Sequence, residues 1–233
     1  MDNLYVFEYD TVTDRPNIGY IKGDKYNLMI DCCGGLNQVT SLKSWLKLNN
    51  LSNPDYIVLT HHHWDHSFGL AYFNSHSISS IYTKSIIDSI IDMKPRKLLD
   101  IISNEYEPMF CIPHLKLEYD NCLSNLKLKR VNETTSYKTI DLGNRLVDIK
   151  EVRANHTLGS LVVYDRVSKY LFIGDADCGV IDEVDFIINK EDIKNFLLDI
   201  SEFDYEYVVR GHSYVVKKND YLKEIGSKFN VAF

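Results

Sequence analysis

The stretch that decides the fold covers residues 60–69 and reads THHHWDHSFG. It holds five potential metal ligands or bases, namely His61, His62, His63, Asp65 and His66. Imidazole and carboxylate groups need hydrogen bonds or a cation once they leave water. The stretch follows PDYIVL, a short apolar run after a proline that is typical of a buried strand. Side chains at the end of such a strand have rigid support, which favours a built site.

The spacing within the cluster separates its histidines into two kinds. His61 and His63 alternate around His62, so in an extended segment they point to one side and His62 points away. Asp65 and His66 follow at the turn into a helix, where they can be aimed at a second ion. An enzyme zinc site usually takes three protein ligands. The four local ligands therefore need partners from other strand ends, and the candidates are His156 in ANHTLGS, Asp175 in FIGDADCG and His212 in VVRGHS.

Composition narrows the class of protein. The 233 residues fit one large domain, with 45% hydrophobic and 25% charged residues. A formal net charge of −7 argues against nucleic acid as a partner. No segment approaches the roughly 20 apolar residues of a membrane span. The acidic start MDNLYVFEYD does not resemble a secretory signal.

The five cysteines are odd in number and form no C-x-x-C pair. This argues against a disulfide framework or a zinc knuckle. Reduced thiols in a cytoplasmic protein are the expectation.

The segments on either side of the cluster predict a layered α/β protein with sheets packed face to face. Runs rich in Tyr, Val, Ile and Phe predict strands, and apolar residues at helical spacing predict helices. The expected strands lie within residues 3–13, 19–35, 54–60, 78–84, 125–131, 139–153, 159–175 and 204–212. The expected helices lie within residues 39–51, 68–73, 86–93, 97–105, 191–203 and 219–229.

Residues 85–130 differ from the rest, with helical pieces broken by Pro95, Pro108 and Pro113. We interpret them as an insertion packed over the core that contributes a wall of the pocket. His114 could line that wall. The Ile- and Leu-rich residues 86–102 predict a core-facing helix or a dimer helix.

The ordered motifs carry a family resemblance. HHHWDH resembles the H-x-H-x-D-H signature of the metallo-β-lactamase superfamily. In the hydrolase branch of that family, a His in H-T-x-G-S, an Asp in G-D and a His in G-H follow in this order, as they do here. Asp31 in LMIDCCGG resembles an early structural Asp of the family. Each motif alone is a weak signal, whereas the ordered set is strong.

The resemblance implies a four-layer αββα sandwich, with two mixed β-sheets flanked by helices in a single domain over residues 1–233. It implies two divalent metal ions, with zinc the first choice and iron or manganese as alternatives. His61, His63 and His156 would bind the first ion, and Asp65, His66 and His212 the second. Asp175 would bridge both.

The implied activity is hydrolysis, with a hydroxide shared by both ions attacking a small ester, thioester or lactone. A bridging Asp resembles the glyoxalase II and lactonase branches of the family. His63 stands where the flavodiiron branch has a carboxylate, which argues against oxygen reduction. Among the catalytic candidates, Asp65 could orient the nucleophile or pass a proton, while Asp31 would hold a ligand imidazole. A phosphodiesterase using the same two ions and a metal-binding sensor without turnover remain alternatives.

The remaining expectations concern substrate and partners. We expect a small-molecule substrate, no nucleic acid and no membrane partner, and a homodimer is an open alternative. Arg153 and Arg210 could each bind a substrate carboxylate or phosphate. The tail after residue 218 lacks the basic helical region that glyoxalase II uses for glutathione, which argues against glutathione thioesters.

Overall fold

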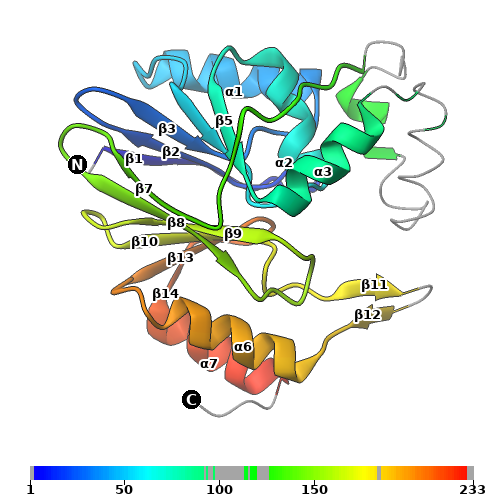
Figure 1. Ribbon diagram of the computed structural model, residues 1–233, viewed down its shortest axis with the longest axis vertical. Coiled ribbons are helices and arrows are strands. Elements are labelled where there is room, and N and C mark those ends of the chain that lie inside the picture. The colour runs from blue at the N-terminus through cyan, green and yellow to red at the C-terminus, as the bar shows by residue number, and fades with distance from the viewer. Residues whose placement is uncertain are drawn as a thin grey trace.

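A computed structural model describes residues 3–91, 93, 97, 113–114, 116–119, 126–182 and 185–229. Two six-stranded sheets lie face to face, with helices on the outer side of each (Figure 1). This is the αββα sandwich that the sequence predicts. The first sheet has the order β1-β2-β3-β4-β5-β6. Its strands are β1 Leu4–Phe7, β2 Ile18–Lys22, β3 Asn27–Ile30, β4 Tyr56–Val58, β5 His76–Ser79 and β6 Glu133–Thr134.

The second sheet has the order β14-β13-β10-β9-β8-β7. Its strands are β7 Tyr137–Asp141, β8 Leu146–Val152, β9 Ser160–Asp165, β10 Tyr170–Gly174, β13 Tyr207–Arg210 and β14 Val216–Lys217. A small hairpin pairs β11 Val180–Asp182 with β12 Asp185–Ile187. Both sheets are mixed, because β3, β4, β5 and β6 pair in parallel in the first sheet and β10 and β13 in the second.

The main core lies between the sheets. Apolar residues of both inner faces meet there, among them Ile30, Val58 and Ile78 from the first sheet and Val163 and Phe172 from the second. β9 is buried along its whole length, as expected for a strand covered on both faces. The sandwich therefore holds the ends of β4, β10 and β13 on rigid supports.

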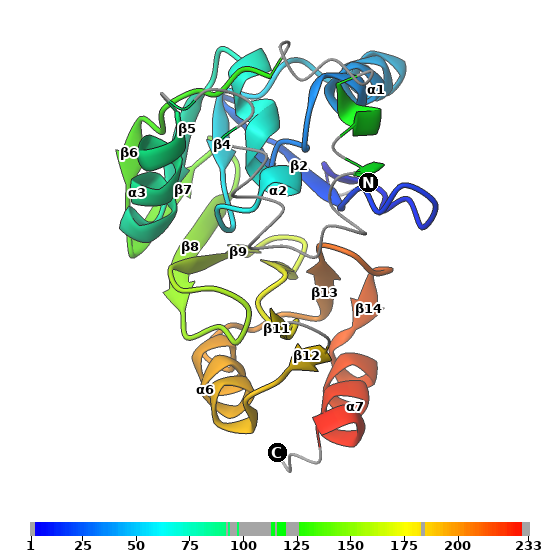
Figure 2. The same ribbon diagram turned by 90° about the vertical axis from the view of Figure 1, so that its right-hand side faces the viewer.

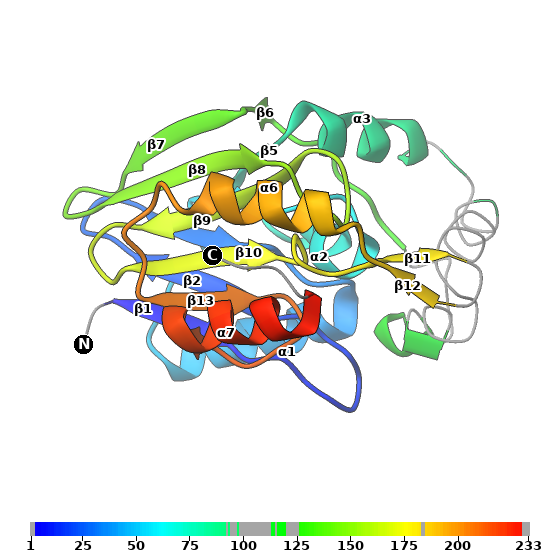
Figure 3. The ribbon, with the colours of Figure 1, turned by 90° about the horizontal axis from the view of Figure 1, so that it is seen from below.

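Two outer layers complete the sandwich. α1 Leu36–Leu48 packs its buried face on the first sheet, and α3 Ile81–Ile90 lies on the same side. α6 Lys190–Ile200 and α7 Lys218–Phe229 cover the second sheet, as Figures 2 and 3 show. Asn189 caps α6 by accepting a hydrogen bond from the Glu191 amide at 3.0 Å. In the described part of the chain, none of the helices is long and apolar enough to cross a membrane.

The structure corrects two of the sequence predictions. Residues 81–84 belong to α3 and not to a strand, because the Ser80 hydroxyl accepts a hydrogen bond from the Thr83 amide at 3.1 Å and starts the helix. Residues 126–130 form no strand, although they alternate in character. Leu126 and Leu128 instead pack beside Trp64 and Phe68.

The strand expected within residues 3–13 is limited to β1, because residues 11–14 form a turn. The other strand and helix predictions stand within a few residues, except for the helix expected at 97–105. That segment lies almost wholly outside the described residues. The short strands β6, β11, β12 and β14 were not predicted.

Candidate metal centre

The seven predicted ligands converge at one edge of the sandwich. Four of them lie just after β4, where α2 Trp64–Ser67 begins and η1 Phe68–Tyr72 follows. The other three lie in the β8–β9 connection, directly after β10 and shortly after β13. Strands from both sheets thus deliver ligands to one place, as the ordered motifs predict.

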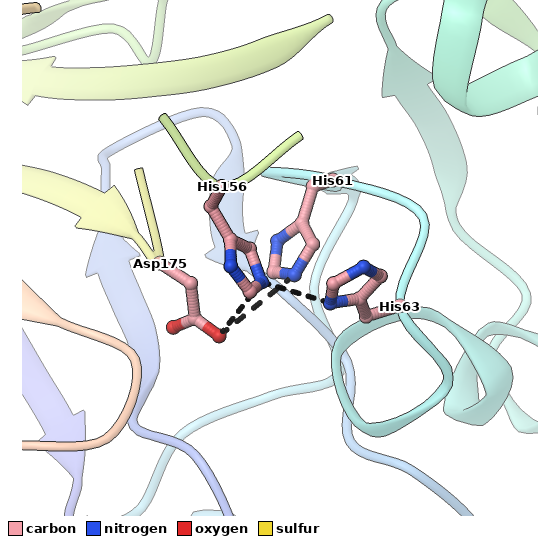
Figure 4. Close-up of side chains that lie close together, drawn as sticks. All are labelled: His61, His63, His156 and Asp175. Carbon is pink, nitrogen blue, oxygen red and sulfur yellow. Dashed lines mark hydrogen bonds and ion pairs between the residues drawn. The ribbon is translucent and has the colours of Figure 1, made fainter. Parts of the chain in front are cut away.

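The first group contains His61, His63, His156 and Asp175, whose ligand atoms all lie within 4.8 Å of one another (Figure 4). His156 Nε2 is 2.9 Å from His63 Nδ1 and 3.7 Å from Asp175 Oδ2. His61 Nε2 is 3.9 Å from the same carboxylate oxygen. Three nitrogens and one oxygen facing a common point are a donor set that suits a divalent transition metal.

The second group contains Asp65, His66 and His212. His212 Nε2 lies 3.0 Å from Asp65 Oδ2 and 3.3 Å from His66 Nε2. His66 Nε2 is 3.5 Å from the Asp65 carboxylate oxygen. These three side chains supply the donors that the sequence assigns to a second ion.

Asp175 belongs to both groups by position. Its Oδ2 atom lies 3.3 Å from His66 Nε2 and 3.4 Å from His212 Nε2, in addition to its contacts with His61 and His156. One carboxylate oxygen is therefore within 3.9 Å of four imidazoles from both groups. This is the arrangement expected of a bridging carboxylate.

In three of these histidines, the hydrogen-bond partner of Nδ1 indicates the tautomer of the ring. His156 Nδ1 donates to the Gly179 carbonyl at 3.1 Å, and His66 Nδ1 lies 2.8 Å from Asp31 Oδ2. Thr60 Oγ1 donates to Asp31 and can therefore accept from His61 Nδ1 at 3.0 Å. With the proton on Nδ1 in each case, a neutral ring turns its Nε2 lone pair toward the centre.

Two observations show that this donor set fits a cation. His61 Nε2 and Asp175 Oδ1 are buried, and within the described residues neither has a hydrogen-bond partner. A buried polar group left in this way costs about 1–3 kcal/mol. Burial also lowers the pKa of His61 and of His63 well below the ordinary value, which leaves both rings neutral and able to act as ligands.

In the second group, the pKa values of the histidines are shifted in the opposite direction. Burial lowers the pKa of His66 and of His212, but the carboxylates around them, Asp175 foremost, outweigh burial and raise both pKa values well above the ordinary range. Without cations, protons on these rings balance the carboxylates. Bound cations would take over that role, so binding would release protons.

Glycine permits the close approach of the strand ends. A Cβ atom on Gly211 would lie 2.0 Å from Asp175 Oδ1 and 2.8 Å from His66 Cε1. The Gly211 amide donates to the Gly174 carbonyl at 2.8 Å, which ties the two ligand-bearing segments together. The G-D and G-H motifs contain both glycines, but their spacing alone did not reveal this role.

Other residues singled out in the sequence lie outside both groups. The His62 ring packs against Tyr82 at 5.8 Å between centroids, and its Nδ1 lies 3.4 Å from Thr157 Oγ1. Burial, followed by the influence of His156, lowers the pKa of His62 to about 4. His62 is therefore a neutral packing residue next to the centre.

The two arginines proposed for substrate binding are engaged elsewhere. Arg210 is mostly buried, and its Nε lies 2.9 Å from Asp177 while Nη1 lies 2.8 Å from Glu224. Arg153 lies directly after β8 and contacts two residues of α6, Asp199 at 2.6 Å and Asn195 at 2.9 Å. Both guanidinium groups thus pair with carboxylates of the protein, and a role of either arginine in substrate binding stays a prediction.

Sequence reasoning missed Thr60 and Asp14. Thr60 links Asp31 to His61, and its place directly before the histidines is the signal that could have indicated it. Asp14 Oδ1 lies 3.2 Å from His212 Nδ1, although 198 positions separate the two residues in the chain. No local pattern marks that contact.

Comparison with known proteins agrees with this geometry. The family profile described as the metallo-beta-lactamase superfamily matches residues 12–212. The chain therefore belongs to the metallo-beta-lactamase superfamily, a class of hydrolase folds whose members generally bind divalent metals.

A curated relative has low sequence identity to this chain. The chain is 26% identical over 175 residues to the acyl-coenzyme A thioesterase MBLAC2 of Gallus gallus, covering 70% of this chain and 57% of that protein. The chain thus spans little more than half the length of this curated relative.

Among solved structures, it resembles a metallo-beta-lactamase family protein of Thermus thermophilus, with a TM-score of 0.67, 13% identity and coverage of 99% and 80% of the two chains. An archaeal superfamily protein of Sulfolobus tokodaii has a TM-score of 0.63, 17% identity and coverage of 100% and 90%. At such identities these structures support the fold alone.

Proposed function

We propose that this protein is a dinuclear metal-dependent hydrolase of small thioesters, esters or lactones. The observation that carries the proposal is the position of Asp175, whose Oδ2 atom lies within 3.9 Å of four imidazoles drawn from both ligand groups. An anionic oxygen between two sets of nitrogen donors suits a pair of cations better than a single one. Zinc is the first candidate, with iron and manganese as alternatives.

The chemistry that such cations supply is Lewis acidity toward a carbonyl oxygen and a lowered pKa of bound water. The protein's own groups would hold and orient the reacting parts. Without cations, the His66 and His212 imidazoles outweigh burial and lower the pKa of Asp65. Bound cations would take over that role and keep the carboxyl group ionised. An ionised carboxylate can accept a hydrogen bond from the attacking water or take up its proton.

Asp31 has a different role in this proposal. Its carboxylate accepts hydrogen bonds from the Thr60 amide and hydroxyl and faces His66 Nδ1 at 2.8 Å. All of these partners are fixed parts of the framework. Asp31 would therefore orient ligand imidazoles and take no direct part in proton transfer.

Thioesters are the first substrate class to test. The relative from Gallus gallus is named an acyl-coenzyme A thioesterase, and it is 26% identical to this chain over 175 residues. Thioesters also combine an electrophilic carbonyl with a good leaving group, which suits attack by an activated water. Acyl-coenzyme A thioesters of graded chain length are the natural probes.

The test compares purified protein, metal-stripped protein and protein reloaded with zinc or manganese on four substrate classes. These are acyl-coenzyme A thioesters followed by thiol release, and chromogenic esters, lactones and phosphodiesters. We expect metal-dependent turnover of thioesters or esters. Turnover of phosphodiesters alone would favour the phosphodiesterase alternative, and two bound ions without any turnover would favour a sensor.

A pair of histidine variants sharpens this test. His63→Ala removes a ligand atom of the first group and should abolish turnover together with at least one metal equivalent. His76→Ala is the matched control, because His76 is exposed and pairs with Glu133 at 2.9 Å. Full activity in His63→Ala would contradict the proposal.

A further inference from the structure

Four histidines turn their Nε2 atom toward Asp175. In three of them, the other ring nitrogen, Nδ1, contacts a group in the protein interior. His61 contacts Thr60, His66 contacts Asp31 and His156 donates to the Gly179 carbonyl. His212 differs, because its Nδ1 faces Asp14 at 3.2 Å. The Asp14 side chain is 50% exposed, whereas that of Asp31 is 3% exposed.

The Asp14 carboxylate belongs to the connection between β1 and β2, which has a defined shape. Asp10 Oδ1 accepts hydrogen bonds from the Val12 amide at 2.9 Å and the Thr13 amide at 3.4 Å. The Asp10 amide donates to the Arg15 carbonyl at 3.1 Å and closes the turn. Asp14 has a φ of 55°, a left-handed conformation that Asp and Asn adopt more readily than most residues.

Two anchors that follow Asp14 in the chain, at Arg15 and at Asn17, fix the position of the turn. Arg15 Nε lies 2.6 Å from the buried carboxylate of Glu118, which also accepts a hydrogen bond from the Gln38 amide at 2.7 Å. Glu118 thereby ties the turn to the start of α1. This anchor lies on the side of the first sheet.

The second anchor joins the turn to the segment that carries His212. Asn17 Nδ2 donates to the Arg210 carbonyl at 2.8 Å and to the Ser213 carbonyl at 2.6 Å. The Asn17 amide donates to the Gly211 carbonyl at 2.7 Å. Because the same residue binds on both sides of His212, the carboxylate of Asp14 and the imidazole keep a fixed relation.

We propose that Asp14 is a positioning residue that holds His212 in its ligand orientation and selectively sets the affinity of the second group, Asp65, His66 and His212, for its cation. The inference rests on the metal centre of the proposed function. The selectivity follows from the contacts, since Asp14 faces one ligand only. Asp31, in contrast, serves His66 directly and His61 through Thr60.

Asp14→Gly is the informative variant, because glycine readily adopts the left-handed backbone and the exposed carboxylate leaves no cavity. Asp14→Asn keeps an acceptor oxygen and should have a smaller effect. Asp24→Gly is the matched control, since it removes the same charge from the turn between β2 and β3 at the other end of the sheet. Metal-stripped forms of all variants are first compared by thermal denaturation, which separates a loss of stability from a change in zinc affinity.

Each protein is then dialysed against graded free zinc, and zinc per chain is measured by mass spectrometry. We expect Asp14→Gly to raise the free zinc needed for one equivalent by about 10-fold or more, with the other equivalent shifted less than about twofold. Asp24→Gly should follow the unaltered protein. In the His212→Ala background, Asp14→Gly should change nothing further, because the imidazole that it holds is gone.

Several results would overturn the inference. Equal shifts of both equivalents, no shift, or the same shift in the His212→Ala background would each contradict a selective positioning role. Two zinc ions bound without hydrolysis of any substrate would contradict the proposed function and leave this inference standing. A chain that bound no zinc, manganese or iron would overturn both.

Discussion

The two halves of the metal centre are built in different ways. Four candidate ligands lie within residues 61–66, which run from the turn after β4 into α2. The other three, His156, Asp175 and His212, come from three separate connections of the second sheet. The first half depends on local backbone geometry, whereas the second depends on the order and register of whole strands.

The contacts at the join show how the second half reaches the first. The Leu161 amide donates to the Thr60 carbonyl at 2.7 Å, directly beside the histidine turn. Gly211 and Gly174 bring β13 and β10 together at their ends. The positions of the candidate ligands therefore depend on how the two sheets contact each other. Variants in the histidine turn and variants in the second sheet should differ in their effects on metal binding and stability.

The largest effect is expected at the residue shared by both groups. Asp175→Asn keeps the shape of the side chain but removes its charge, so both cations should bind weakly and hydrolysis should fall about 10³-fold or more. The estimate follows from the several kcal/mol that metal Lewis acidity supplies and about 1.4 kcal/mol for each factor of ten. Zinc content and kcat/KM measure the outcome, and retention of two tightly bound ions would be incompatible with a shared carboxylate.

A backbone variant on the second half should rank next. Gly211→Ala places a methyl group 2.0 Å from Asp175 Oδ1, so the segment that carries His212 must shift. We expect a loss of about 1–3 kcal/mol in the free energy of unfolding of the metal-free protein, together with weaker metal binding. Denaturant unfolding with and without zinc separates the two effects, and unchanged zinc affinity would show that the close approach has no role in binding.

Further from the centre, the second sheet should control stability without affecting the metals. The Asp148 carboxylate at the far end of β8 contacts Arg166 at 2.6 Å and 2.7 Å and accepts from Thr139 at 2.7 Å. Despite burial, these hydrogen bonds lower the pKa of Asp148. Asp148→Asn should reduce the free energy of unfolding at pH 7 by about 1–2 kcal/mol, discounted because Arg166 is largely exposed.

The Asp148→Asn variant also tests how the free energy of unfolding depends on pH. A carboxyl whose pKa is lower in the folded state contributes stability above its unfolded pKa, about 3.9, and loses it as pH falls through the folded value. The difference between the unaltered protein and Asp148→Asn should therefore be constant near neutrality and shrink below about pH 4. Urea unfolding at several pH values tests this, and a difference that grows in acid would have the wrong sign.

The smallest effect is expected inside the histidine turn itself. His62→Ala removes a ring that packs on Tyr82 and lies outside both ligand groups. Metal content should stay near that of the unaltered protein, with a modest loss of stability from the lost packing. Loss of both ions in this variant would show that the alternation of the three histidines does not separate ligands from packing residues.

Sequence could predict the parts of the site that local chemistry determines. Alternation separated His62 from its neighbours. Strand-end motifs identified the distant residues that converge with the histidine turn, because the family resemblance supplied their order. The points where helices begin were harder to predict. Ser80 starts α3 through one side-chain hydrogen bond, and this outweighed the strand character of Ile81 and Tyr82.

Contacts between distant loops could not be predicted at all. Arg210 resembled a substrate anchor by its position before His212, yet Asp177 and Glu224 occupy its guanidinium group. Asp14 is an ordinary turn residue in sequence and gains its role only because Asn17 ties its turn to the strand end. Such contacts follow from the packing of the two sheets, which no short pattern encodes.

Because the ligands come from both sheets, a bound cation would act as a cross-link across the sandwich. Anything that binds only the folded state raises the midpoint of thermal denaturation in proportion to the logarithm of its concentration over its dissociation constant. Melting curves recorded across a series of divalent ions would then rank the candidates by affinity. The physiological metal could be narrowed in this way before any substrate is identified.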